Sequence, residues 1–313
     1  MAVRQEAETE EDRAEPAPSA VMGERRRLIG LAYRLLGSLA DAEDAVQEAY
    51  TRWYAMPGEQ RRDIASPGAW LTRVAGRICL DLLGSARVRR ERYVGEWVPE
   101  PLPGGTDRTA GAPPADPAEQ VALDESVGMA FLVMLESMTP AERVAFVLHD
   151  VFRYPFAEVA RIVGRSPAAC RRLASSARRR VPAPRTPVPE ARQARIVREF
   201  KEAWEAADVD ALIGLLAPDA TGVADGGGRA GAARRPVRGG ERIARYLLAF
   251  ADRMPRPAVL ERTVNGRPGL VVLEGGTVVT VAAFDIEGDR IKRIWAVRNP
   301  DKLRAWTADA PRG

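Results

Sequence analysis

Apolar residues recur at helical spacing through the first part of the chain. Three stripes with this spacing predict three helices, over residues 28–35, 42–55 and 66–82. We expect Asp41 to cap the second helix and a Ser-Pro pair to begin the third. The pattern therefore predicts an all-helical block over residues 21–97.

The stretch over residues 156–180 predicts two shorter helices joined at Gly164. In the second helix the apolar residues fall within one narrow arc, and Ser166 caps its start. The remaining arc is polar and mostly basic: Arg171, Arg172, Ser175, Arg178 and Arg179. This arrangement is typical of a helix-turn-helix whose second helix enters a DNA major groove. An arginine-rich face on an ordinary surface helix is the alternative, but the turn and the clean apolar arc together favour DNA binding.

Strand-like segments appear only in the last block. A predicted helix over residues 190–207 is followed by Asp208, which we expect to cap a short helix ending at Leu216. The strand-like segments are 221–224, 258–264, 270–273, 278–286 and 291–297. Glycine-containing turns between them predict hairpins. Helices followed by such a meander indicate an α+β domain with a curved antiparallel sheet.

Charge is unevenly placed along the 313 residues. The chain has 47 Lys and Arg against 43 Asp and Glu, which gives a net charge of +4. Between Arg161 and Arg198 the only carboxylate is Glu190, whereas the first fifteen residues contain six. We therefore expect a disordered acidic tail over residues 1–20 and a nucleic-acid partner for the middle of the chain.

Two proline-rich stretches predict extended linkers. They cover residues 98–117, which also contain several glycines, and residues 182–189. They divide the chain into three folded blocks. These blocks span residues 21–97, 118–181 and 190–308.

The remaining composition bears on cellular location. No apolar run approaches the ~20 residues that span a bilayer, and no signal peptide opens the chain. The two cysteines, Cys79 and Cys170, are too few for a disulfide framework, which favours a reducing cytoplasm. Cys170 lies beside Arg171 and Arg172, as a redox-sensing thiol would. Its place in the apolar arc favours a buried structural thiol instead.

The order of these parts resembles the extracytoplasmic-function class of bacterial sigma factors. The acidic helix over residues 41–53 is similar to sigma domain two, and residues 119–181 are similar to sigma domain four. Three motifs narrow the resemblance to the subgroup with a SnoaL-like C-terminal extension. They are Trp97-Val-Pro-Glu-Pro101, Asp225-Gly-Gly-Gly228 and Asn299-Pro-Asp-Lys-Leu303. The implied fold is multidomain, with two all-α sigma domains followed by an α+β SnoaL-like cone.

The resemblance also implies partners and site residues. Core RNA polymerase, through its beta and beta-prime subunits, would bind Asp44, Gln47, Glu48 and Arg52. A melted downstream promoter strand would bind the loop over residues 61–66 together with Trp70, Arg73, Arg77 and Asp81. Upstream promoter DNA would bind Ser166, Arg171, Arg172, Ser175, Arg178 and Arg179.

We further expect the three motifs to fold the extension back onto domain two and the linker as a regulatory contact. Its residues are Trp97, Pro99, Glu100, Pro101, Asp225, Gly226, Gly227, Gly228, Asn299, Pro300, Asp301, Lys302 and Leu303. Residues after Leu303 are not expected to take part. The alternative is that these motifs form turns within an independent domain and contact no other domain.

SnoaL-like folds also include enzymes, so catalysis must be weighed. The only histidine, His149, lies in domain four, and the extension offers only Asp225 and Asp285 as candidate acids or bases. We expect no catalysis, no metal site and no cofactor, and we leave open whether the cone binds a ligand. The predicted function is an alternative sigma factor that is regulated by its own extension. The alternative is a ligand-sensing repressor that acts without polymerase, and the acidic helix over residues 41–53 argues against it.

Overall fold

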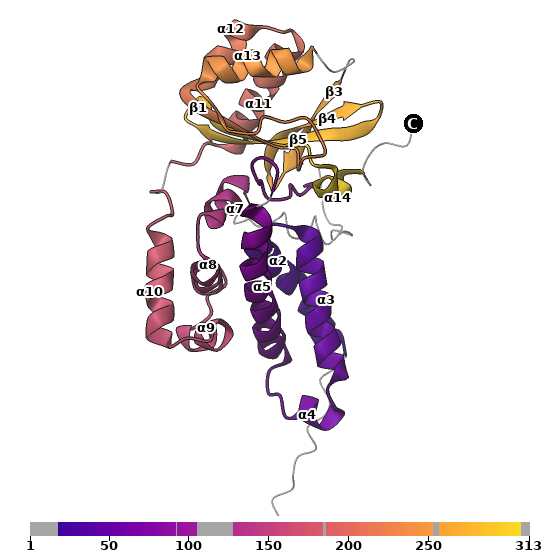
Figure 1. The fold of residues 1–313 in the computed structure, drawn as a ribbon, viewed down its shortest axis with the longest axis vertical. Helices are drawn as coiled ribbons and strands as arrows, with labels where there is room; N and C mark the ends of the chain where they lie inside the picture. The colour runs from indigo at the N-terminus through magenta and orange to yellow at the C-terminus, as the bar shows by residue number, and fades with distance from the viewer. Residues whose placement is uncertain (1–17, 92, 105–127, 184–185, 253–256, 308–313) are drawn as a thin grey trace, which may run out of the picture.

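The computed structural model describes residues 18–91, 93–104, 128–183, 186–252 and 257–307. Nearly all of the expected acidic tail therefore lies outside the described residues, as do residues 105–117 of the first expected linker and 184–185 of the second. Two helical units lie below a sheet-containing C-terminal domain in Figure 1.

The first helical unit comprises α1 (Pro18–Gly23), α2 (Arg25–Leu36), α3 (Leu39–Ala55), α4 (Gly58–Arg62) and α5 (Pro67–Glu91). The apolar stripes of α2, α3 and α5 pack into one core that includes Trp53 and Leu71. The expected cap at Asp41 is wrong. Ser38 caps α3 instead, since its Oγ accepts from the Asp41 backbone N–H at 3.3 Å, and the helix begins three residues earlier than the pattern predicted.

The second helical unit comprises α7 (Met129–Glu136), α8 (Pro140–Phe146), the π-helical turn η2 (Val147–Val151), α9 (Phe156–Val163) and α10 (Pro167–Arg178). A reciprocal capping box begins α8, in which Thr139 and Glu142 satisfy each other's backbone N–H groups. Gly164 ends α9 at φ 70°, a left-handed conformation that glycine adopts at little cost. The helix-turn-helix geometry thus has the predicted turn.

One apolar core runs through both helical units. It extends from α2, α3 and α5 into α8, α9 and α10 without a gap. Arg143 of α8 is buried in this core, where its guanidinium donates to the Leu35 carbonyl at 2.9 Å and pairs with Glu136 at 3.0 Å. The two units are therefore packed against each other. Within the described residues, none of the helices has the length and apolar character needed to cross a membrane.

The C-terminal domain begins with α11 (Glu190–Glu205) and α12 (Val209–Leu215), the latter capped by Asp208 as predicted. Its sheet has the order β2-β1-β6-β5-β4-β3. The strands are β1 (Leu216–Asp225), β2 (Val237–Arg238), β3 (Ala258–Val264), β4 (Arg267–Glu274), β5 (Thr277–Glu287) and β6 (Arg290–Val297). The helix α13 (Gly240–Ala251) and the strand β2 were not predicted.

The sheet is mixed rather than wholly antiparallel. The meander from β3 to β6 pairs as predicted, but β1 lies parallel to β6, with Gly222 opposite Ile294 and Asp225 opposite Val297. The chain leaves β1 and returns through α13 and the meander, so β6 enters the centre of the sheet beside β1 in the same direction. That pairing joins distant segments, and the local alternation of each strand carries no sign of it.

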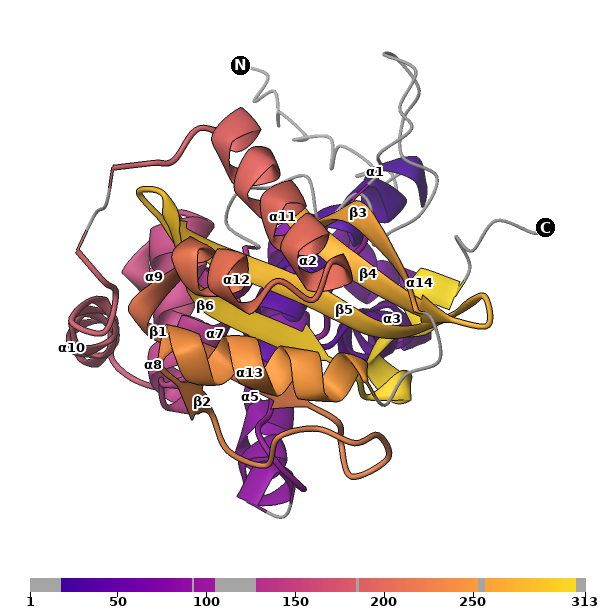
Figure 2. The same cartoon turned by 90° about the horizontal axis from the view of Figure 1, so that it is seen from above.

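Both faces of the sheet are covered. Figure 2 shows α11, α12 and α13 across one face, where they form an apolar core with Phe200, Ile243 and Phe284. The other face packs a second core around Trp295 against Val98 and Met129. A short 3-10 helix, η3 (Pro300–Lys302), and α14 (Arg304–Thr307) close this side. The second core joins the C-terminal domain to the segment that follows α5.

Candidate nucleic-acid interface

The recognition helix, α10, presents a basic surface to solvent. Ser166 caps it by accepting from the Ala169 N–H at 3.2 Å. Its inner side is buried through Cys170, Ala174 and Ala177, while its outer side carries the exposed polar residues predicted for DNA contact: Arg171, Arg172, Ser175, Arg178 and Arg179. Burial raises the pKa of the Cys170 thiol, which fits a structural cysteine better than a reactive one.

The four arginines differ in their intramolecular partners. Arg178 pairs with Asp150 at 2.7 Å, and the Arg171 guanidinium lies 5.5 Å from the Phe156 ring centroid. Within the described part of the chain, Arg172 and Arg179 have no ion-pair partner. They are therefore free to take a phosphate or a guanine edge without first breaking a contact.

We predict that alanine substitutions on this helix separate base readers from phosphate contacts. Replacing a base-reading arginine should weaken binding to its promoter by ~1–3 kcal/mol and relax specificity at one position. Replacing a phosphate-contacting arginine should weaken binding to all sequences alike and reduce the salt dependence. The measurement is the affinity for promoter and scrambled duplexes at several salt concentrations, for the four single variants. Unchanged affinity in all four would remove α10 as the DNA reader.

The second predicted DNA surface lies along α5. Arg73 and Arg77 are exposed, and Arg77 pairs with Asp81 one turn later at 3.6 Å. Trp70 is only half-exposed, because its ring packs edge-on against Trp53 with centroids 5.3 Å apart. Trp70 is thus partly a core residue, and one face at most remains for stacking on a base.

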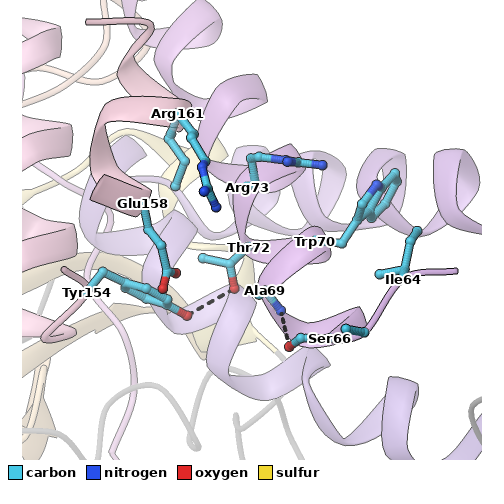
Figure 3. A pocket seen from close by; sticks show the side chains of 11 residues that line it. Ile64, Ser66, Ala69, Trp70, Thr72, Arg73, Tyr154, Glu158 and Arg161 are labelled. Atoms are coloured by element: carbon cyan, nitrogen blue, oxygen red, sulfur yellow. Dashed lines mark hydrogen bonds between the residues drawn. The ribbon is translucent and has the colours of Figure 1, made fainter. Parts of the chain in front are cut away.

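The first helix of the helix-turn-helix lies against this strip. A cleft of about 330 Å³ separates them, lined on one side by α5 and the loop before it and on the other by Tyr154, Glu158 and Arg161 (Figure 3). Thr72 Oγ1 and Tyr154 Oη are 3.1 Å apart, and Arg77 donates to the Ile162 carbonyl at 3.5 Å. In this arrangement the second helical unit covers one flank of the strip predicted to hold melted DNA.

The predicted polymerase-binding residues share one face of α3. Asp44, Gln47, Glu48 and Arg52 are all exposed, and Arg52 pairs with Glu48 at 2.9 Å. The opposite face is buried in the core of the first helical unit. The face is therefore available to another protein without any change in the fold.

The three motifs predicted to form a regulatory contact meet at a buried carboxylate. Asp225 ends β1 and has no exposed surface, so it is a buried strand residue. Its side chain accepts from Tyr93 Oη at 2.6 Å, from the Val98 N–H at 3.0 Å and from Lys302 Nζ at 2.6 Å. This carboxylate alone joins β1, the segment after α5 and the C-terminal end of the fold.

Lys302 is the cation of this contact. It is 5% exposed, donates to the Val98 carbonyl at 2.5 Å and lies 3.1 Å from the Trp97 ring centroid. A buried ammonium is tolerated only when its charge and its N–H groups are satisfied, and here a carboxylate, a carbonyl and an aromatic face share that task.

The glycines and the asparagine of the motifs allow close approach. Asn299 Oδ1 accepts from the Asp301 N–H at 3.1 Å to turn the chain, and Asn299 Nδ2 donates to Tyr93 Oη at 2.9 Å. Gly227 has φ 59°, and a side chain there would clash with Asn299. A side chain at Gly226 would clash with the backbone of Ala230. Asp301, in contrast, pairs with Arg229 at 2.8 Å inside the C-terminal domain.

The segment over residues 93–104, called here the linker segment, is also held by the first helical unit. Glu100 donates its N–H to the Gly37 carbonyl at 2.8 Å, and its carboxylate accepts from the Leu39 N–H at 2.8 Å. Burial raises the pKa of Glu100. Residues 98–103 are all buried, Pro99 and Pro101 among them. The expected extended linker over residues 98–117 therefore begins as packed structure, because its prolines lie between two domains.

Two further residues in this contact were missed from the sequence. Tyr33 of α2 donates to the Glu100 carbonyl at 2.6 Å and accepts from Asn265 Nδ2 at 2.9 Å. Asn265 exchanges backbone and side-chain hydrogen bonds with Leu102. An Asn-Gly pair between two strands signals a turn, but nothing local shows that the turn meets another domain.

The predicted end of the contact at Leu303 is wrong. Leu303 is buried as part of it, but so is Trp306 in α14, whose Nε1–H donates to the Pro101 carbonyl at 2.8 Å. Arg304, which lies between them, faces solvent. The contact therefore continues one helical turn beyond Leu303.

The two carboxylates weighed for catalysis both serve structural contacts. Asp225 is held as described above, and Asp285 pairs with Arg293 at 3.1 Å. His149 stacks on Phe156 with ring centroids 3.8 Å apart in the second helical unit. Each carboxylate is therefore occupied by an ion pair within the fold.

Two parts of the chain match known protein families. Residues 20–89 match Sigma-70 region 2 and residues 128–181 match Sigma-70 region 4. These matches coincide with the two helical units described above.

Full-length similarity extends to sigma factors of Mycobacterium tuberculosis. The chain is 40% identical to the ECF RNA polymerase sigma factor SigJ, over 89% of this chain and 90% of that protein. It is 34% identical to the probable ECF RNA polymerase sigma factor SigI, over 93% of this chain and 97% of that protein. The crystal structure of SigJ superimposes with a TM-score of 0.74 at 37% identity, covering 92% of this chain and 99% of that one. None of these matches supports the repressor alternative.

Proposed function

The chain belongs to the extracytoplasmic-function (ECF) RNA polymerase sigma factors, and we propose that its C-terminal domain regulates promoter use by holding the linker segment. The chain is thus an alternative sigma factor, which binds core RNA polymerase and promoter DNA. We place this activity in the cytoplasm, together with the polymerase.

Attachment to polymerase is assigned to the outer face of α3. The residues that would dock on the clamp coiled coil of RNA polymerase are Asp44, Gln47, Glu48 and Arg52. The expected partner is core polymerase, through its beta and beta-prime subunits. The support for this assignment is that all four side chains are exposed on one side of a helix whose other side is core.

Promoter contacts are assigned to two separate surfaces. The recognition helix α10 would read the upstream element in the major groove. The strip on α5 and the loop over residues 61–66 would hold the melted downstream strand through charge and one aromatic face. The packing of α9 beside that strip implies that the two helical units move apart when both promoter elements are engaged.

The observation that carries the regulatory proposal is the double anchoring of the linker segment. Its Glu100 is bound to the first helical unit, and Tyr93 and Val98 are bound to Asp225 of the C-terminal domain. The linker connects the two promoter-binding units, so its course limits how far they can separate. Release and retention of this contact form a two-state equilibrium that polymerase or a signal would shift.

Removing the C-terminal domain should change promoter output. We predict that a chain ending at Pro189 differs several-fold from the full-length chain in promoter-specific transcription with purified core polymerase. The reason is that the linker segment then loses one of its two anchors, since Val98 is released from Asp225 while Glu100 stays bound to the first helical unit. A chain ending at Thr307 is the matched control, because it retains Lys302 and Trp306, and it should behave as the full-length chain does. Equal output from the chain ending at Pro189 and the full-length chain would contradict the regulatory role.

A further inference from the structure

A small cavity lies in the C-terminal domain between the helices and the covered face of the sheet. It encloses about 70 Å³. Aromatic side chains from α11 and α13 form one wall, and mostly apolar side chains of the four central strands form the other. Figure 2 shows these helices lying across the sheet. The lining includes Phe200, Trp204, Tyr246, Phe250, Phe284 and Ile294. No part of the function proposed above uses this cavity.

One cation lines this otherwise apolar space. Arg298 follows β6, and its Nε donates to Thr280 Oγ1 at 3.1 Å while its Nη1 donates to the Gly231 carbonyl. Its guanidinium carbon lies 4.4 Å from the Phe250 ring centroid. Among the described residues that line the cavity none is a carboxylate, and Glu274, which acts on the charge of Arg298, lies outside the lining.

A half-buried guanidinium at the edge of an apolar cavity is a suitable partner for an anion that enters the cavity. Burial lowers the pKa of Arg298, yet a guanidinium stays protonated in proteins, so the charge remains beside apolar walls. A carboxylate is the anion that a guanidinium binds best with two parallel hydrogen bonds. A phosphate dianion would bring more charge than these apolar walls can solvate.

We propose that this cavity binds a small carboxylic acid with a compact apolar group, whose carboxylate pairs with Arg298 and whose apolar group fills the space beside Phe284. The size of the cavity sets the size of that group. A dry apolar cavity of about 150 Å³ holds a benzene molecule, so 70 Å³ suits a branched chain of roughly three to five carbons.

The position of Arg298 connects this site to the contact that holds the linker segment. Its backbone N–H donates to the Asp225 carbonyl at 2.7 Å, and the next residue, Asn299, donates to Tyr93. Gly231, whose carbonyl Arg298 holds, follows the glycine run after Asp225. A bound carboxylate that draws the guanidinium away from Gly231 would therefore act one residue from the contact that holds the linker segment. The effect of this on transcription rests on the regulatory role proposed above.

The test is a calorimetric titration of the full-length chain with sodium 3-methylbutanoate. The uncharged amide of the same shape, 3-methylbutanamide, is the matched probe. Loss of a charge-assisted hydrogen bond should weaken binding of the amide by about 10- to 100-fold. Arg298→Gln should weaken the acid to the same extent, while Arg245→Gln, an exposed arginine on α13 that pairs with Glu241, should leave it unchanged.

A second variant keeps the test decisive if Arg298→Gln perturbs the fold. Ala282 lines the cavity, so Ala282→Leu fills it with apolar atoms and should abolish binding while the far-ultraviolet circular dichroism stays unchanged. Undetectable binding of the acid at millimolar concentration, equal affinity for acid and amide, or full binding by Ala282→Leu would each overturn the site.

Transcription assays with and without 3-methylbutanoate test the connection separately. A change in output for the wild-type chain that Arg298→Gln removes would support it. Binding without any change in output would overturn the connection but leave the site standing. Neither result depends on the comparison of the full-length chain with the chain ending at Pro189.

Discussion

Replacing Lys302 with methionine should destabilise the contact between the C-terminal domain and the linker segment by ~3–5 kcal/mol. The substitution leaves Asp225 as a charge with no exposed surface and no cation beside it. Tyr93 and Val98 still donate to the carboxylate, but hydrogen bonds alone do not offset the loss of its counter-charge. The measurement is the free energy of unfolding of the full-length chain in urea.

Two variants control for trivial effects of this substitution. The double variant Asp225→Asn, Lys302→Met removes both charges and should recover most of the loss, because the neutral amide can still accept from Val98. Lys292→Met removes a lysine of the same domain whose partner, Asp219, is exposed, and it should cost at most ~1 kcal/mol. If Lys302→Met and Lys292→Met cost the same, the buried pair does not hold the contact.

Reversing two charges on α3 should strongly weaken attachment to core polymerase. We expect Asp44→Lys, Glu48→Lys to weaken core binding by on the order of 100-fold, since like charges placed across an interface cost several kcal/mol. Both residues are exposed, so the stability of the chain should change by no more than ~0.5 kcal/mol. The measurement is the affinity of the labelled chain for core polymerase by fluorescence anisotropy.

The matched control reverses two exposed carboxylates elsewhere. Glu202 and Glu205 lie on α11 and are exposed, so Glu202→Lys, Glu205→Lys makes the same change in net charge away from α3. This variant should bind core polymerase as the wild-type chain does. Equal weakening by both double variants would mean that net charge, rather than the α3 face, governs attachment.

Local pattern predicted the helices well and the sheet less well. The stripes of α2, α3 and α5 are apolar at helical spacing because each packs into one core, so sequence spacing carries the information. The helix α13 was missed because its N-cap position is Gly239, which has φ 98° and no side chain to act as a cap. The parallel pairing of β1 with β6 was missed because partner choice between distant strands leaves no local trace.

The contact between the C-terminal domain and the linker segment was predicted where its residues belong to the three motifs. Contact residues that lie outside these motifs were missed. The resemblance singled out Asp225, Asn299 and Lys302, and the structure brings these three together. Tyr33 and Asn265 were missed, because a tyrosine in an apolar stripe and an asparagine in a turn have ordinary local explanations. Their role depends on the packing of two domains against each other, which the residues near each of them in the sequence do not reveal.

The separation along the chain between the two halves of the linker contact has a consequence for biosynthesis. Tyr93 and Asn299 are 206 residues apart, so at ~5–20 residues per second the ribosome finishes the second about 10–40 seconds after the first. During that interval Val98 and Leu102 have no C-terminal domain to cover them. The two helical units share one apolar core that needs no residue of the C-terminal domain, so under the proposed regulation a prematurely terminated chain would be released without its C-terminal anchor.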